Sequence, residues 1–155
     1  MMPCISKKIV APAIAVLVLA VPARSHDHAT GVVKDRMDMM EDMAKRMKGM
    51  RARIDSKTGL AAIKEDAGSI ASHAPHLVHL FPPGSTQKPT DAKSAIWQNW
   101  PDFERKAAVL EAESKKLINT SADDPTALSA QFRAVSAACS GCHEKYRTKS
   151  RKGDM

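Results

Sequence analysis

Apolar residues recur along this chain in alternating steps of three and four, the spacing of one face of an α-helix. Four segments carry the pattern: from about 32 to 54, from about 60 to 80, from about 101 to 119, and from 125 to about 146. No segment shows the strict alternation of a half-buried strand. The pattern therefore predicts an all-α domain.

The first segment has an apolar face made largely of methionine. Thr30 precedes it and is a candidate N-cap, because its hydroxyl can accept a hydrogen bond from a free backbone N–H. Methionine often fills irregular gaps in protein cores, so this face is expected to be buried. The stripe comprises Val33, Met37, Met40, Ala44, Met47 and Ile54, with Met39, Met43 and Met50 alongside it.

The second segment contains Pro75, which removes a backbone donor and should kink or split the helix. Residues 81–89 are rich in proline and also contain a glycine, which predicts a loop. A short helical turn is expected within residues 92–97. The apolar stripe of this second segment comprises Leu60, Ile63, Ala67, Ile70, Ala74, Leu77 and Phe81.

The last two segments have proline at their starts, where the missing N–H has no helical partner to lose. Pro101 begins one of them, and Pro125 follows two acidic residues at the start of the other. Short connections between amphipathic helices predict an antiparallel four-helix bundle, in which ligand sites lie between facing helices. The inward residues are Phe103, Ala107, Leu110, Leu117, Leu128, Phe132, Val135, Cys139, Cys142 and Tyr146.

The N-terminus has the pattern of a secretory signal peptide. Two lysines precede an apolar run over residues 9–20, and Ala23 and Ser25 supply small residues at the cleavage site. The run is shorter than the roughly 20 residues that span a bilayer, which argues against a retained anchor. We predict cleavage after Ser25, with Ala23 as the alternative. Residues 1–25 would be removed, and 26–155 would form one periplasmic domain that does not span the membrane.

The charge of the chain does not indicate a nucleic-acid partner. The formal net charge is +7, and it falls to +4 without residues 1–25, which hold three basic residues and no acidic one. Basic residues are spread along the helices, and aromatic residues make up only 4% of the chain, too few to interleave with them for base stacking. We therefore expect no binding to nucleic acid.

The pentapeptide Cys139-Ser140-Gly141-Cys142-His143 is the attachment signature of a c-type haem. Two thiols one helical turn apart can each form a thioether to the haem, and the adjacent imidazole can bind the iron as proximal ligand. A redox dithiol is one alternative in an exported protein. A zinc site is another, and it would need further ligands such as His73, His76 and His79. The sequence predicts one covalent haem c.

Beyond this pentapeptide, the mature chain resembles the class II c-type cytochromes, the cytochrome c′ group. The resemblance rests on Cys-x-x-Cys-His-x-x-Tyr-Arg near the C-terminus, ending here in Tyr146 and Arg147. It also rests on an arginine in the first helix four residues before the distal residue, here Arg36 and Met40, and on Ile96-Trp97 before the third long helix. The family fold is the same four-helix bundle.

The resemblance implies roles for these residues. Arg36 would pair with a haem propionate, Tyr146 would pack against the porphyrin, and Arg147 would act electrostatically near the proximal side. Met40 would be the distal iron ligand of a low-spin His/Met member. Met37 and Met43, about one helical turn before and after it, are the alternative ligands. A soft thioether favours Fe(II).

A low-spin member would act as a one-electron carrier between redox partner proteins and would not be an enzyme. The alternative is a five-coordinate cytochrome c′ that binds nitric oxide or carbon monoxide. Relatives commonly form homodimers through their first two helices.

Overall fold

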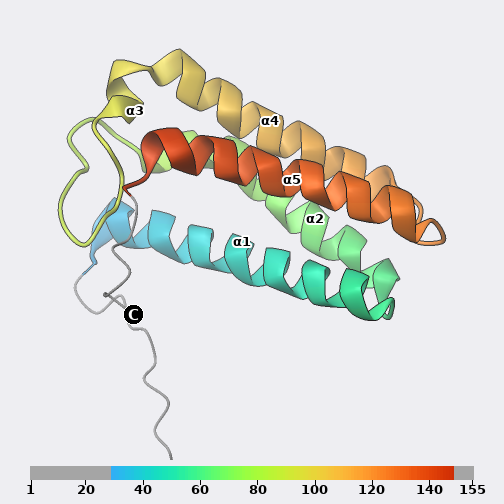
Figure 1. The fold of residues 1–155 in the computed structure, drawn as a ribbon. Coiled ribbons are helices and arrows are strands. Elements are labelled where there is room, and N and C mark those ends of the chain that lie inside the picture. Colours follow the sequence, from blue (N-terminus) through green and yellow to red (C-terminus); the bar gives the residue numbers. More distant parts are fainter. Residues whose placement is uncertain (1–28, 149–155) are drawn as a thin grey trace, which may run out of the picture.

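A computed structural model describes residues 29–148 (Figure 1). Within that range the chain is helical, and its one extended pairing is an isolated antiparallel bridge between Ala92 and Arg147. This confirms the all-α prediction. In chain order, with η for 3-10 helices, the elements are α1 (Gly31–Ser56), η1 (Leu60–Ala62), α2 (Ile63–His73), η2 (Ala74–Leu80), α3 (Ala95–Gln98), α4 (Trp100–Asn119) and α5 (Pro125–Tyr146).

The long helices form the predicted antiparallel four-helix bundle (Figure 1). Helices α1 and α4 run in one direction, and α2 and α5 run back. As a result the start of α1, the end of η2, the 81–94 loop, α3 and the end of α5 all meet at one end of the bundle, on the left of Figure 1. The residues that the sequence singled out for chemistry lie at this end.

The helix boundaries follow local signals in most places. Helix α2 ends at His73, and the chain continues as a 3-10 helix with Pro75 in its first turn, so the predicted split is confirmed. Asp124 caps α5 by accepting hydrogen bonds from the backbone N–H groups of Thr126 (3.1 Å) and Ala127 (2.9 Å).

The predicted N-cap of α1 is confirmed in its position, Thr30, but not in its hydrogen bond. Thr30 does stand at the N-cap position with extended backbone, but its side chain makes no capping hydrogen bond. The next residue, Gly31, has a φ of +55°, a left-handed conformation that glycine adopts without strain. The chain thus enters α1 through an unusual turn, and its geometry differs from that of an ordinary threonine cap.

The buried face of α1 is rotated from the predicted stripe. Met43 and Met50 are buried, two turns apart, whereas Ala44 is exposed. The physical reason is that α1 faces two surroundings: Met43 and Met50 pack against the main core, and Ala44 lines an open cavity. The predicted inward residues of α4 and α5 are buried, except the two cysteines, which are half-buried.

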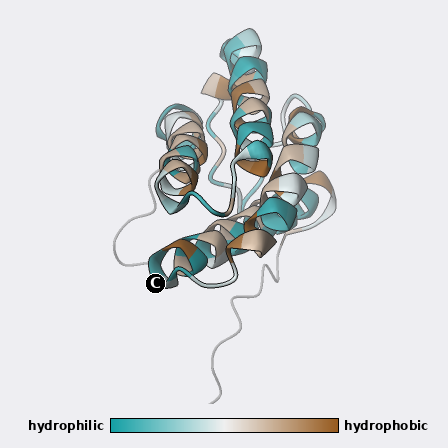
Figure 2. Cartoon of the chain, turned by 90° about the vertical axis from the view of Figure 1, so that its right-hand side faces the viewer, coloured by the Kyte–Doolittle hydropathy of each residue, from teal (hydrophilic) through white to brown (hydrophobic). Residues whose placement is uncertain are grey.

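The apolar side chains form two clusters. The larger one fills the middle and far end of the bundle, and includes Met50, Ile63, Leu117 and Val135, each fully buried. The smaller one consists of Phe81, Ile96, Phe103 and Tyr146 at the loop end. Figure 2 shows that each helix carries both hydrophobic and hydrophilic residues, as expected for amphipathic helices that share a core. None of the helices within residues 29–148 has the length and apolar character that crossing a bilayer requires.

We expect Met50→Ala to lower the free energy of unfolding by about 2–5 kcal/mol, because it leaves a cavity at a fully buried position. Urea unfolding of the two proteins measures the difference. Val109→Ala is the matched control, since Val109 is 46% exposed and its loss should change stability by less than about 0.5 kcal/mol. Equal effects of the two substitutions would contradict the core described above.

Candidate functional site

A cavity of about 480 Å³ opens at the loop end of the bundle, between the first half of α1 and the last turn of α5. Its size lies within the roughly 300–1,000 Å³ of small-molecule and cofactor sites. The 81–94 loop and the smaller apolar cluster form its remaining walls. The lining residues are Arg36, Met37, Met40, Glu41, Ala44, Phe81, Pro89, Thr90, Asp91, Ala92, Ile96, Phe103, Cys142, His143, Tyr146 and Arg147.

The last two turns of α5 carry the Cys-x-x-Cys-His motif on unbroken helix. Cys142 lines the cavity and packs against the smaller cluster, whereas Cys139 packs against the main core one turn earlier. Both side chains are half-buried, and neither is in a disulfide. The helix therefore presents two free thiols in one row beside His143, as thioether attachment requires.

The environment of the thiols argues against the redox dithiol alternative. Burial raises the pKa of the Cys139 thiol, and it raises the pKa of Cys142 to about 11. Reactive cysteines in dithiol oxidoreductases have a lowered pKa, because the thiolate is the nucleophile. The raised pKa values favour the protonated thiol at Cys139 and Cys142 near neutral pH.

The zinc alternative also lacks support in this geometry. Within residues 29–148, no group of three or more histidine, cysteine, aspartate or glutamate side chains is arranged to hold a metal ion. His73 instead lies 3.4 Å from Asp42 across α1 and α2, and the rings of His76 and His79 are 6.5 Å apart.

His143 lines the cavity from the end of α5, where the residue remains exposed. Desolvation by the surrounding protein, and then the positive charge of Arg147, lower the pKa of His143. Neutral imidazole is the form that offers a lone pair to a metal ion. The local electrostatics therefore suit the side chain to axial ligation.

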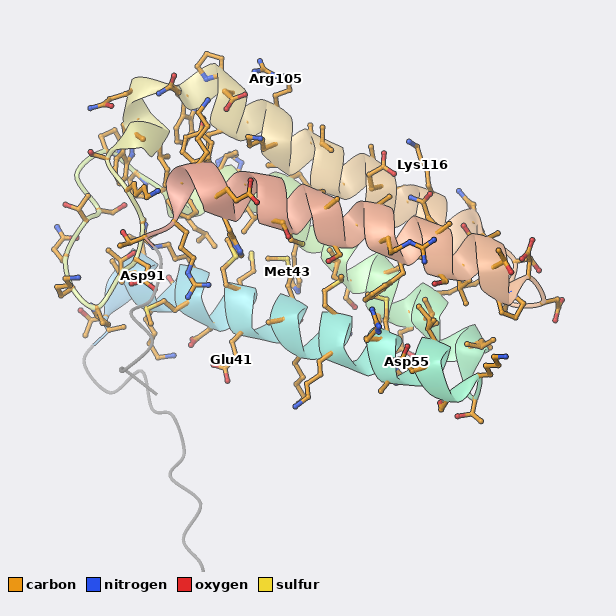
Figure 3. All side chains as sticks on the ribbon, viewed as in Figure 1. Glu41, Met43, Asp55, Asp91, Arg105 and Lys116 are labelled. Carbon is orange, nitrogen blue, oxygen red and sulfur yellow. The ribbon has the colours of Figure 1, made fainter. Side chains whose placement is uncertain are left out.

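Helix α1 supplies the wall opposite the motif. The positions of its methionines reduce the number of candidates for the distal iron ligand. Met37 and Met40 line the cavity, and Met40 packs against both apolar clusters. Met43 is buried in the main core and does not line the cavity (Figure 3). Two of the three candidate thioethers can thus face a group held by α5.

Arg36 is 3% exposed and lies in the cavity wall. Its two terminal nitrogens donate to Ser85, one to the carbonyl oxygen at 2.6 Å and the other to the hydroxyl at 3.2 Å, and the guanidinium lies 4.7 Å from the centre of the Phe81 ring. Its Nε is buried and has no partner among the described residues. A buried donor of this kind suits an anionic group such as a carboxylate entering the cavity.

Tyr146 forms part of the same wall from the end of α5. It is 3% exposed, and its ring packs edge-on against Phe103 with 5.5 Å between ring centres. Its hydroxyl donates to Asp102 Oδ2 at 2.6 Å. Lys145 donates to the same oxygen at 2.7 Å, and these hydrogen bonds, that from Lys145 first, hold the pKa of Asp102 well below its usual range.

The 81–94 loop is attached to both helices that face each other across the cavity. Arg36 of α1 holds it at Ser85. Beyond α5, Arg147 pairs with Asp91 at 3.2 Å, and the Thr148 N–H donates to the Asp91 carbonyl at 2.8 Å. Figure 3 shows Asp91 in the loop at this end of the bundle. Arg147, which is exposed, therefore contacts the loop as well as the cavity.

Six of the seven residues singled out from the sequence line one cavity: Arg36, Met40, Cys142, His143, Tyr146 and Arg147. Cys139, the seventh, lies one turn away along α5. Sequence reasoning missed the loop residues Pro89, Thr90 and Asp91, and it missed Asp102. Their contacts join segments far apart in the chain, and no local motif signals them.

An all-helical bundle that presents Cys-x-x-Cys-His from its last helix to an apolar cavity defines a c-type cytochrome of the helical-bundle class. A family model described as Cytochrome C′ matches residues 31–147, which is most of the chain. The chain belongs to the cytochrome c′ family.

Similar proteins agree with this assignment. Cytochrome c-556 from Agrobacterium tumefaciens (strain II Chrys) is 31% identical over 121 residues, covering 77% of this chain and 98% of that protein. The solved cytochrome c′ from Rhodopseudomonas palustris is 26% identical with a TM-score of 0.72, covering 79% of this chain and 99% of that one. Cytochrome c′ from Thermochromatium tepidum is also 26% identical, with a TM-score of 0.70, covering 76% and 95%.

Members of this family carry covalently attached haem c, and this chain is a monohaem c-type cytochrome. The residues present fit that group. The cavity is mainly apolar, Cys142 and His143 line one wall with Cys139 one turn earlier on α5, and a buried unpaired donor of Arg36 lies in another wall.

We expect Asp102→Asn to reduce stability in a way that depends on pH. The folded pKa of Asp102 lies below the ordinary value of 3.8, so its ionised form stabilises the fold above pH 3.8, and this contribution is lost as pH falls toward the folded pKa. The stability difference between wild type and variant should be constant from pH 7 to about pH 4, and should shrink below that. Urea unfolding at several pH values measures it, and a difference that does not change with pH would contradict the assignment.

Proposed function

We propose that Cys139 and Cys142 hold the haem through thioethers and that His143 binds its iron on the proximal side. The support is the row of side chains on the last turns of α5, which runs from the core-facing Cys139 to the cavity-lining Cys142 and His143. The lowered pKa of His143 favours the neutral imidazole, which is the form that can bind the iron.

On the distal side, we assign the sixth ligand position of the iron to Met40 of α1. Met40 lines the cavity from the helix that faces the motif, and it contacts both apolar clusters, so its side chain is held by packing. Met37 lines the same cavity one turn nearer the start of α1 and is the alternative, whereas the buried position of Met43 argues against that residue. Arg36 would present its unpaired Nε to a haem propionate.

The function that follows is one-electron transfer, with the iron cycling between Fe(III) and Fe(II). The single observation that carries it is the cavity that has His143 on one wall and Met40 on the facing one. A thioether ligand favours Fe(II), and burial of the haem also tunes its reduction potential. This function involves no chemical change in a substrate. The protein would exchange electrons with redox partner proteins.

Gas binding by a five-coordinate haem is the second candidate. The nitric oxide complex of a mutant of cytochrome c′ from Alcaligenes xylosoxidans has been solved, and that protein is 28% identical to this chain with a TM-score of 0.66, covering 76% of this chain and 94% of that one. If no methionine bound the iron, the same cavity would leave its distal side open for nitric oxide or carbon monoxide.

We place the mature protein in the periplasm. Residues 1–25, which lie outside the described residues, would be a cleaved signal peptide, and residues 26–155 would be the cytochrome domain. A homodimer is part of the proposal by similarity, since one similar structure (27% identical, TM-score 0.71) is a cytochrome c′ with a ligand-controlled dimer dissociation.

Replacing both Cys139 and Cys142 by alanine should abolish covalent haem, because no other cysteine lies between residue 26 and the C-terminus. Haem staining after denaturing electrophoresis measures it. Ser140→Ala is the control, since Ser140 is exposed between the two thiols and should leave attachment intact. Covalent haem that persists in the double variant would rule out these residues as the attachment points.

Met40→Leu should convert a low-spin oxidised haem to high spin, open the distal side to carbon monoxide and lower the reduction potential, because it removes the soft ligand that favours Fe(II). Absorption spectra and a redox titration measure these changes. Met43→Leu is the matched control, because it changes a methionine three residues along α1 that does not line the cavity.

Met37→Leu decides between the two cavity-lining methionines. Low-spin iron in Met37→Leu together with high-spin iron in Met40→Leu supports Met40 as the ligand. Wild-type protein that is already high-spin and binds carbon monoxide rapidly would favour the gas-binding function.

A further inference from the structure

One carboxylate joins the last turn of α5 to the first turn of α4. Asp102 Oδ2 accepts from the Tyr146 hydroxyl at 2.6 Å and from Lys145 Nζ at 2.7 Å, and Arg105 donates to Oδ1 at 2.5 Å. Two of these donors come from α5, 43 and 44 residues further along the chain. Asp102 is thus the acceptor at which the end of α5 is bonded to α4.

Tyr146 is held at both ends of its side chain. The ring packs edge-on against Phe103, with the two planes at 89°, and faces the cavity as part of the smaller apolar cluster. The hydroxyl reaches Asp102, so it cannot rotate without losing a hydrogen bond to a charged acceptor. Such hydrogen bonds are stronger than those between neutral groups.

The turn that Tyr146 ends is the turn that carries the haem motif. Cys142 is four residues before Tyr146 and His143 is three residues before it, which places all three within about one helical turn. A displacement of Tyr146 would therefore displace the imidazole and the second thiol with it.

We propose that Asp102 is a positioning residue, which fixes the turn of α5 bearing Cys142 and His143 by holding the Tyr146 hydroxyl. The inference rests on the proposed function in two respects, that His143 is the proximal ligand and that Met40 is the distal one. Thioethers would tie α5 to the haem, but the location of α5 relative to Met40 on α1 still has to be set by the protein. The hydrogen bond from Tyr146 to Asp102 fixes the location of this end of α5 relative to α4.

The charges around Asp102 favour a hydrogen bond from Tyr146 that persists throughout the neutral pH range. Lys145 and Arg105 compensate the carboxylate, and their hydrogen bonds, with that from Tyr146, hold the pKa of Asp102 well below its usual range. Burial, and then Asp102, raise the pKa of Tyr146, so the phenol keeps the proton that it donates. The acceptor stays charged and the donor stays protonated throughout the neutral range.

Tyr146→Phe tests the anchor without changing charge or ring packing. In the holoprotein, amide hydrogen exchange in the last turn of α5 should become about tenfold faster or more, because a hydrogen bond to a charged group is lost. The reduction potential should fall, because displacement of His143 would weaken the bond between the Met40 sulfur and the iron. Asp102→Ala should accelerate the same amides, and the double variant should exchange no faster than the faster single variant.

Asp55→Asn is the matched control. It removes a carboxylate that also accepts a side-chain hydrogen bond, from Arg51 at 2.9 Å, but at the opposite end of the bundle (Figure 3). Asp55 lies 15 residues beyond Met40, roughly 22 Å along α1 at the helical rise of 1.5 Å per residue. Neither the exchange of the α5 amides nor the potential should change.

Two results would overturn the proposal. Exchange in the last turn of α5 that matches wild type in both Tyr146→Phe and Asp102→Ala would show that the bond does not hold the turn. Faster exchange with an unchanged potential and spectrum in Tyr146→Phe would show a purely structural bond. If Asp102→Ala does not fold, Tyr146→Phe decides alone. The wild-type spectrum tests the proposed ligation separately, so the two proposals can fail independently.

Discussion

The structure depends on keeping one apolar cavity open between two helices that otherwise pack into a common core. Such a space is costly to leave empty, because its lining atoms lose packing partners and apolar surface meets water. The chain confines the cavity to one end of the bundle, where α1 and α5 face each other, and packs Met50, Leu117 and Val135 tightly beyond it. A haem in that space would restore the missing contacts, so attachment and folding are expected to be linked.

The walls of this cavity are fixed by polar contacts at their outer edges. On α1, Arg36 holds the loop at Ser85 and lies over Phe81. Across the aromatic cluster, Tyr146 is bonded to Asp102 on α4. Aromatic rings fill the cavity wall, and hydrogen bonds from charged groups hold it in place. The start of α1 and the end of α5 can therefore keep a constant separation. A constant separation is what a pair of axial ligands from two different helices requires.

Much of the fold was predictable from sequence because its causes are local. Alternating apolar steps indicated the four helical segments, Pro75 marked the break between α2 and η2, and the Cys-x-x-Cys-His spacing marked one wall of the site. The α1 stripe was less well predicted, because a methionine-rich helix that faces both a core and a cavity has no single apolar face. Contacts such as Arg36 with Ser85, 49 residues apart, depend on tertiary packing and leave no local signal.

The proposed function requires that α5 and α1 each supply one axial ligand to the same iron. Electron paramagnetic resonance of the oxidised wild-type holoprotein tests this ligation most directly, because the spin state reports whether a protein ligand fills the sixth position. Ligation by both helices predicts a low-spin Fe(III) signal throughout neutral pH. A high-spin signal there would contradict ligation by Met40 and would leave the cavity as a site for small gases.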